Sequence, residues 1–200
     1  FIDDPDDERH VATVRALCAD VHVARLDPRL ARILSLRSLL AREALTLGYY
    51  RSSALRNWVD ETCRRRHIDT AVIFSSAMAQ YLDKQPRIPT VIDFVDVDSA
   101  KWTQYAPRHR WPLSWLYRRE GKLLLDYERR MAARASRSFF ATDNEVALFA
   151  QKAPECRVRV QTMGNGVDAE YFSADDMRPS PFARDELPMV FTGAMDYLPN

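Results

Sequence analysis

The chain has 200 residues, of which 46% are hydrophobic and 28% are charged. That composition suits one well-packed domain, is marginal for two, and excludes an intrinsically disordered chain. Its 29 basic and 28 acidic side chains give a net charge of +1. A global electrostatic field that would attract nucleic acid or an anionic membrane is therefore excluded, and any basic binding site has to be local.

The cysteines and the first residues indicate the compartment. Cys18, Cys63 and Cys156 are widely spaced, form no CxxC pair and have no histidines at metal-ligand spacing. This pattern favours a reducing cytoplasm over a disulfide framework or a zinc site. Residues 1–5 lack an initiator methionine, a basic segment and an apolar segment, so we expect neither a signal peptide nor a natural start. No apolar run approaches the roughly 20 residues that a membrane-spanning helix needs.

The first elements in chain order are two helices with a short strand between them. Asp4-Pro5 is a typical helix start, with Asp as the cap and Pro in the first turn. Alternating apolar residues predict a strand over 20–26. Residues 28–47 predict a helix that is apolar over much of its surface and therefore buried on more than one side. The apolar face of the first helix consists of Val11, Val14, Leu17 and Cys18.

The later elements alternate between strands and helices, which predicts an α/β fold with a doubly wound, mostly parallel Rossmann-like sheet. The predicted strands cover 68–74, 89–95, 138–141 and 158–162, and the predicted helices cover 52–66, 112–135 and 144–152, with a short helix opening at Ser75. Residues 1–172 would form this domain, and 173–186 form a linker rich in Pro, Ser, Asp and Arg. Residues 187–200 would then hold the first strand, at 187–191, and the first loop of a second Rossmann-like domain.

Ligands of open α/β sheets bind outside the carboxyl ends of the strands, so the strand-to-helix junctions are the candidate sites. The junctions offer Ser75 and Ser76, then Asn144, then Asn165 and Gly166. The serines could bind a hydroxyl or a phosphate at a helix N-terminus, although simple helix capping is the reading that we favour. Asn165-Gly166 is a strong turn signal. Gly193, after the strand at 187–191, could let a phosphate approach the backbone.

Asp93, Asp96 and Asp98 form the densest acidic cluster, and we expect them on one side of an extended segment. Like charges at this spacing disfavour ionisation unless cations or ligand hydroxyls compensate them, which suggests a functional site. A metal site is disfavoured because no second acidic motif supplies the remaining ligands. The structural alternative is that backbone amides satisfy Asp93 while Asp98 caps the next helix with Ser99.

Residues 108–119 interleave aromatic rings with arginines. The surface that they form could rest at a bilayer interface through Arg108, Trp111, Trp115 and Arg118, or stack on a sugar or a nucleic acid. The aromatic positions partly continue the apolar seam of the helix, which favours a core helix with buried tryptophans and solvated arginines.

Several motifs resemble one protein family over nearly the whole chain. Residues 165–168, Asn-Gly-Val-Asp, followed by Phe172 resemble the element that leads from the acceptor domain to the donor domain of GT-B retaining glycosyltransferases of family 4. Residues 191–200 resemble the first strand end and loop of their nucleotide-sugar domain. Residues 74–81, 91–102 and 117–121 are similar to the sugar transferases associated with exosortase and PEP-CTERM exopolysaccharide clusters.

The resemblance implies transfer of a sugar from a nucleotide-diphosphate donor to a polysaccharide or lipid-linked acceptor, with retained configuration and no bound metal or other cofactor. The protein would act in exopolysaccharide biosynthesis in the cytoplasm or at the inner face of the plasma membrane, without binding nucleic acid. Compared with the family, the chain would be truncated at both ends, so we expect residues 1–200 alone to be inactive. A non-catalytic α/β module that binds a small phosphorylated ligand is the alternative.

The resemblance also assigns roles to residues. Asp96 stands near the position where many family members have a histidine close to the reacting sugar, and is the catalytic candidate. Gly193 and Asn200 would contact the donor. The residues that would line the acceptor side of the cleft are Ser75, Ser76, Asp93, Asp98, Asn144, Asn165 and Gly166.

Overall fold

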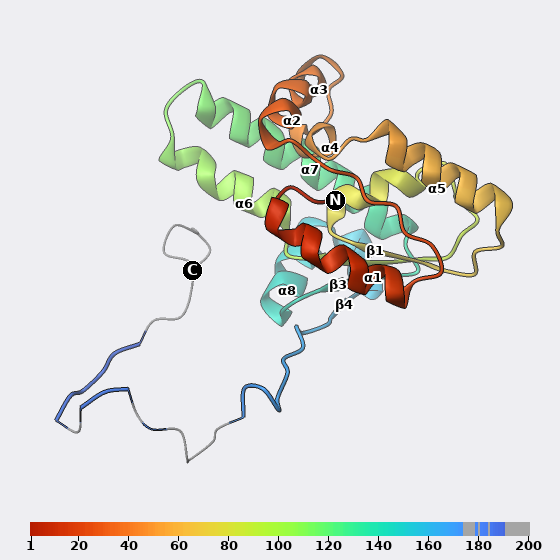
Figure 1. Cartoon of the computed structure of the whole chain (residues 1–200). Helices are drawn as coiled ribbons and strands as arrows, with labels where there is room; N and C mark the ends of the chain where they lie inside the picture. The colour runs from red at the N-terminus through yellow and green to blue at the C-terminus, as the bar shows by residue number, and fades with distance from the viewer. Residues whose placement is uncertain (174–178, 180, 184, 191–200) are drawn as a thin grey trace. The chain divides into compact units, whose positions relative to one another are not determined.

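The computed structural model describes residues 1–173, 179, 181–183 and 185–190 (Figure 1). The chain divides into two compact units, Phe1–Gly164 and Asn165–Asn200. In the second unit the turn predicted at Asn165-Gly166 is wrong. The turn lies at 169–172, because Asp168 Oδ1 accepts hydrogen bonds from the amides of Glu170 and Tyr171.

The strand predicted at 187–191 is also not found, since residues 187–190 form no strand. A strand depends on a hydrogen-bonded neighbour, and the described part of the second unit offers none. Residues 191–200, with the predicted donor contacts Gly193 and Asn200, lie outside the described residues.

The N-terminal helix is confirmed, but its apolar face is not buried. A 3-10 turn, η1 (Pro5–His10), leads into α1 (Val11–Leu17), and Asp4 Oδ1 accepts a hydrogen bond of 2.9 Å from the amide of Asp6. No residue of α1 is buried. The strand predicted over 20–26 is reduced to one parallel bridge, in which the amide of Ile2 donates to Ala24 O at 2.9 Å.

The helix predicted over 28–47 is three short helices, α2 (Pro28–Ser35), α3 (Arg37–Leu40) and α4 (Leu45–Tyr49). The break after α3 contains Arg42, whose φ of 54° is incompatible with a continuing right-handed helix. A regular helix follows, α5 (Ser53–Arg65), capped by Ser52 Oγ, which accepts from the amide of Leu55 at 3.2 Å.

The four strands of the first unit are all parallel, in the order β1, β2, β3, β4. They are β1 (Ala71–Phe74), β2 (Thr90–Val95), β3 (Arg137–Phe140) and β4 (Val160–Thr162). The connections are η2 (Ser76–Leu82), then α6 (Asp98–Tyr105), η3 (Ala106–Arg108) and α7 (Leu113–Arg134), then α8 (Asp143–Lys152) and η4 (Pro154–Arg159). The predicted α/β class with a parallel, Rossmann-like sheet is confirmed.

One face of the sheet carries the core. Phe94 of β2 and Phe140 of β3 stack at 5.2 Å between ring centroids, and Phe149 of α8 closes over Phe140 at 4.9 Å. All three rings are fully buried. Alternation along β1 puts Val72 and Phe74 on the opposite face, and both are exposed. The helical layer therefore packs on the face that contains Ile92 and Phe94.

Helices α6 and α7 lie side by side (Figure 1), and a glycine and a glutamate bring them together. Gly121 of α7 leaves room for the backbone of α6. Further along α7, the buried Glu128 accepts hydrogen bonds from Ser99 N at 3.2 Å and from Ser99 Oγ at 2.6 Å. Burial raises the pKa of Glu128 to about 8, although the two bonds from Ser99 oppose this shift.

Gly121→Ala should destabilise the protein. The added Cβ would lie 2.5 Å from Thr103 Oγ1 and 2.9 Å from Ser99 O, so α6 has to shift. We expect a loss of about 1–3 kcal/mol in the free energy of unfolding, despite the better helix propensity of alanine. Chemical denaturation measures it, with Gly166→Ala as the control, because a Cβ there meets nothing within 4 Å. Equal stability of the two variants would contradict the close packing of α6 on α7.

Glu128→Gln should change how stability depends on pH. Since the pKa of Glu128 is about 8 in the folded state and near 4.5 in the unfolded state, its contribution is complete below pH about 4.5 and is lost as pH rises toward 8. Glutamine keeps the shape, and its carbonyl oxygen can accept from Ser99 N while its amide group donates to Ser99 Oγ. We expect nearly equal unfolding free energies at pH 4 and an advantage for the variant on the order of 4 kcal/mol at pH 8. Parallel pH profiles of the two proteins would show that Glu128 titrates normally.

Candidate functional site

Two neighbouring strands end in strained backbone. Ser75, directly after β1, has a φ of 72°, and Val95, at the end of β2, has a φ of 66°. Positive φ is costly for residues with a Cβ, especially for β-branched valine. Ser75 N donates to Asp93 O at 2.8 Å, which holds the two strand ends together. Strain of this kind is concentrated at functional sites, and here it lies at the carboxyl edge where ligands of parallel sheets bind.

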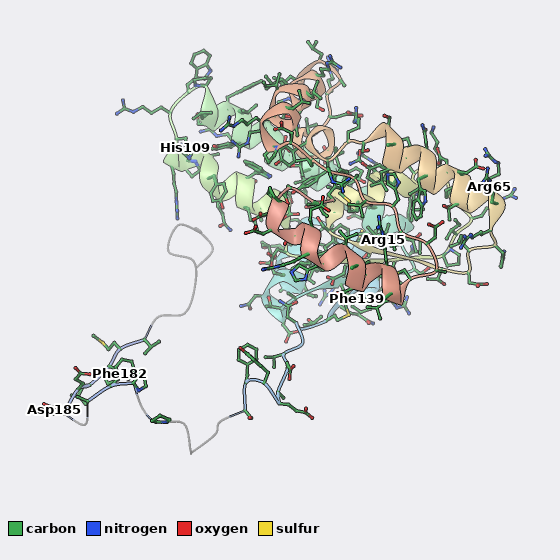
Figure 2. All side chains as sticks on the ribbon, viewed as in Figure 1. Arg15, Arg65, His109, Phe139, Phe182 and Asp185 are labelled. Carbon is green, nitrogen blue, oxygen red and sulfur yellow. The ribbon has the colours of Figure 1, made fainter. Side chains whose placement is uncertain are left out.

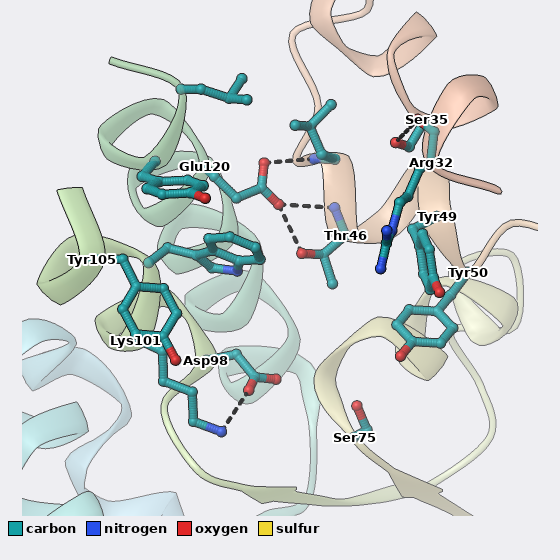
Figure 3. A pocket seen from close by; sticks show the side chains of 14 residues that line it. Arg32, Ser35, Thr46, Tyr49, Tyr50, Ser75, Asp98, Lys101, Tyr105 and Glu120 are labelled. Atoms are coloured by element: carbon teal, nitrogen blue, oxygen red, sulfur yellow. Dashed lines mark hydrogen bonds and ion pairs between the residues drawn. The ribbon is translucent and has the colours of Figure 1, made fainter. Parts of the chain in front are cut away.

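A cavity of about 590 Å³ opens at this edge. Figure 3 shows its two sides: Arg32, Tyr49 and Tyr50 face Lys101 and Tyr105 across the space, with Ser75 and Asp98 at the end nearest the strands. The size is in the range of small-molecule sites. Its walls come from α2 and α4, which precede β1 in the chain, and from α6 and α7, which connect β2 to β3.

Aromatic rings make up much of the walls. On the α6 and α7 side, the ring of Trp102 lies 5.3 Å from that of Tyr117, and Tyr105 meets Tyr117 edge-on at 6.3 Å. On the opposite side, Tyr49 and Tyr50 form an edge-to-face pair at 4.9 Å. Such walls offer a ligand apolar faces together with hydroxyl donors at their rims.

Asp98 is the acidic group at the end of the cavity nearest the strands, and Glu120 is the other acid of the lining. Its carboxylate accepts from Ser76 Oγ at 3.2 Å and from Lys101 Nζ at 3.3 Å. Burial raises the pKa of Asp98, against the lowering effect of Lys101 and Ser76. Lys101 Nζ also donates to Asp96 Oδ2 at 2.8 Å, so one ammonium group compensates both carboxylates. The predicted capping role of Asp98 is wrong, because Val97 is the N-cap of α6.

A pair of α7 side chains fixes the turn that forms the far wall. Glu120 is buried and accepts from the amides of Leu45 and Thr46 at 2.6 and 2.8 Å and from Thr46 Oγ1 at 2.8 Å, which caps the N-terminus of α4 (Figure 3). Its neighbour Arg119 donates to the carbonyl oxygens of Ser38, Leu39 and Glu43 at 3.0 to 3.3 Å. Ser38 and Leu39 belong to α3 and Glu43 to the turn after it. The last carbonyls of a helix lack donor partners within the helix.

The predicted site residues are only partly brought together. Ser75 and Asp98 line the cavity, and Ser76 is buried behind Asp98. Asp96 is held by Lys101 but does not line the cavity. Asp93 Oδ1 accepts a hydrogen bond from the amide of Val95 at 3.0 Å. This agrees with the alternative prediction that backbone amides satisfy Asp93.

The remaining predicted residues lie elsewhere. Asn144 is exposed in the first turn of α8, a helix capped by Thr142 Oγ1, and it does not line the cavity. Asn165 and Gly166 belong to the second unit and are exposed there.

Several cavity residues were missed by sequence reasoning, namely Arg32, Tyr49, Tyr50 and Glu120. Arg32 lies in the segment predicted as one long helix, 28–47, and Tyr49 and Tyr50 directly follow it. The break of that segment could not be inferred from its apolar pattern. The signal for Glu120 was available, since a glutamate flanked by Tyr117, Gly121 and Leu124 on a helix face is placed toward the core.

The tryptophans at the start of α7 are exposed, so the favoured prediction of buried rings is wrong. Trp111 is 80% exposed and Trp115 is 52% exposed. The seam that does face the core begins with Ser114 and continues through Glu120 and Leu124, which turns Trp115 outward. His109, in the connection between α6 and α7 (Figure 2), packs edge-on against Tyr117 at 5.0 Å.

Within the residues that the structure describes, no cluster of three or more His, Cys, Asp or Glu could hold a metal ion. Within the same residues, no helix combines the length and the apolarity needed to cross a membrane. Family models, curated proteins and solved structures were compared with the chain, and none of them matches it.

Proposed function

We propose that the chain is the acceptor-side domain of a metal-independent, retaining GT-B glycosyltransferase of family 4 that acts in exopolysaccharide biosynthesis. The observation that carries the proposal is the cavity at the carboxyl ends of β1 and β2, where Asp98 lies among aromatic walls. In the proposed reaction a nucleotide-diphosphate-sugar bound by a second domain would donate the sugar. The cavity would hold the glycan or lipid-linked acceptor.

The chemistry of the cavity suits an acceptor hydroxyl. Sugar rings present apolar faces and many hydroxyls, and the cavity supplies tyrosine and tryptophan rings beside Ser75, Asp98 and Lys101. A carboxylate whose pKa is raised by burial gains by accepting a hydrogen bond from a ligand hydroxyl, and it is a better base for the proton of that hydroxyl. In this proposal Asp98 binds and orients the acceptor, and Asp96 stays the catalytic candidate that the resemblance assigns.

Asp98→Asn should reduce sugar transfer by the full-length protein on the order of 10²-fold in kcat/KM for the acceptor. The amide keeps the size of the side chain, so the melting temperature should change little. Asp69→Asn, an exposed aspartate outside the cavity, is the control for loss of charge. Normal kcat/KM in Asp98→Asn would refute the acceptor role of the cavity, and unchanged turnover in Asp96→Asn would exclude Asp96 as the catalytic residue.

We propose in addition that the start of α7 contacts the membrane from which a lipid-linked acceptor would be taken. The exposed rings of Trp111 and Trp115 stand beside Arg108 and Arg118. Indole rings prefer the headgroup level of a bilayer, and arginines pair with lipid phosphates.

Trp115→Ala should weaken binding to anionic vesicles by about fivefold in a co-sedimentation assay. Leu17→Ala is the matched control, because it removes an apolar side chain of α1 that is 81% exposed. Binding of the wild type should fall with salt, since the arginine contribution is screened. Equal sedimentation of the two variants, or no binding by the wild type, would refute the membrane contact.

A further inference from the structure

A second cavity, of about 690 Å³, lies beside the second half of α7. Its lining comes from the α3–α4 turn, the start of α5, the end of η2 and α7 between Leu123 and Arg134. It shares no lining residue with the cavity at the carboxyl edge of the sheet. The proposed glycosyltransferase function assigns it no role.

The charge of this second cavity is predominantly positive, with six basic and three acidic side chains in the lining. Two acids are neutralised within the protein. Glu43 pairs with Arg51 at 2.6 Å, and Asp83 pairs with Arg134 at 3.5 Å. Asp126 is the one remaining acid of the lining, against four further basic side chains.

Three of those four basic groups have no acceptor among the described residues. Arg56 donates to Gln80 O at 3.0 Å, but Arg42, Lys84 and Arg130 make no hydrogen bond or ion pair with any part of the chain that the structure describes. Arg42 also has a left-handed backbone conformation, with a φ of 54°. It lies in the turn between α3 and α4, which Arg119 and Glu120 hold by hydrogen bonds to the backbone before and after Arg42. Unpaired guanidinium groups beside a cavity suit phosphate oxygens, which they can bind through two parallel hydrogen bonds.

A buried hydroxyl in the lining also lacks a partner. Tyr127 is 4% exposed, and its hydroxyl has no hydrogen-bond partner among the described residues. Burial raises the pKa of Tyr127 strongly, so the hydroxyl keeps its proton and remains a donor. The guanidinium of Arg130 lies 5.9 Å from the centre of the Tyr127 ring. An unpaired buried hydroxyl is rare and costly, and it requires an explanation such as a bound ion.

We infer that this second cavity binds a ligand that carries a phosphate group. Arg42, Lys84 and Arg130 neutralise its charge, and the Tyr127 hydroxyl donates a hydrogen bond to one of its oxygens. The volume leaves room for a substituent on the phosphate, which makes a phosphomonoester the class of ligand that fits. Both a soluble phosphorylated molecule and a lipid headgroup have this chemistry.

Titration calorimetry of the full chain with inorganic phosphate, at constant ionic strength, tests the inference. Arg130→Gln and Lys84→Gln should each weaken phosphate binding by about fivefold or more. Lys84 is an exposed residue, so its variant should fold normally. Arg87→Gln, which removes an exposed charge outside the cavity, should bind phosphate as the wild type does.

Tyr127→Phe gives the most specific result. Removing the unpaired hydroxyl should leave the melting temperature of the unliganded protein equal or higher, while phosphate binding weakens by about threefold to tenfold. Absence of phosphate binding by the wild type up to about 50 mM would overturn the inference. Equal affinities of the wild type and the cavity variants would overturn it as well, because binding would then be a general salt effect.

Vesicle binding distinguishes a lipid headgroup from a soluble phosphorylated molecule as the ligand of the second cavity. In the Trp115→Ala background, which removes the proposed membrane contact at the start of α7, the protein is sedimented with phosphatidic acid vesicles and with phosphatidylcholine vesicles. Binding to phosphatidic acid alone, lost in Arg130→Gln and displaced by inorganic phosphate, would support a lipid headgroup. Binding of inorganic phosphate without binding to either vesicle would support a soluble phosphorylated ligand.

Discussion

The buried carboxylate of Glu120 is the interaction on which both cavities depend. A charged group removed from water is costly unless it is fully hydrogen-bonded, and here the amides of Leu45 and Thr46 supply the bonds. These amides are unsatisfied donors at the start of α4, so the carboxylate and the helix end satisfy each other. Arg119 donates to carbonyl oxygens of α3 and of the turn after it. Two consecutive residues of α7 thereby fix a turn that has little regular structure of its own.

That turn separates the two cavities. Leu45 and Thr46 line the cavity at the sheet edge, whereas Glu43 and Ala44, immediately before them, line the second cavity. Helix α7 divides in the same way. Its first half lines the cavity at the sheet edge, and its second half lines the second cavity. The two sites therefore differ in chemistry although they share a wall. Tyrosine and tryptophan rings surround the first cavity, together with Asp98 paired to Lys101 and Glu120 bonded to the start of α4. The second cavity is lined by a buried hydroxyl and by cations that have no acceptor among the described residues.

The cavity at the sheet edge depends on the strand ends as well. The strained backbone of Ser75 and Val95 is held by the hydrogen bond from Ser75 N to Asp93 O and by the bond from Val95 N to Asp93 Oδ1. Asp93 thus acts on the site through the backbone, and Asp98 faces the ligand space directly. The three acids within six residues therefore have three different environments. Asp93 bonds to the backbone, Asp96 bonds to Lys101, and Asp98 lines the cavity.

The sequence by itself determined the α/β class and the positions of β1 to β4, because short apolar runs bounded by polar junctions are local signals. The cap Asp4 follows from local chemistry too. The sequence also placed Ser75 and Asp98 at the ligand edge, because that edge follows from strand direction alone. Only the tertiary structure decided the break of the helix predicted over 28–47, the burial of Glu120 and Glu128, the exposure of Trp111 and Trp115 and the unpaired hydroxyl of Tyr127. Each of these depends on partners far away in the sequence, and a periodic pattern shows which face of an element is apolar but not what packs against it.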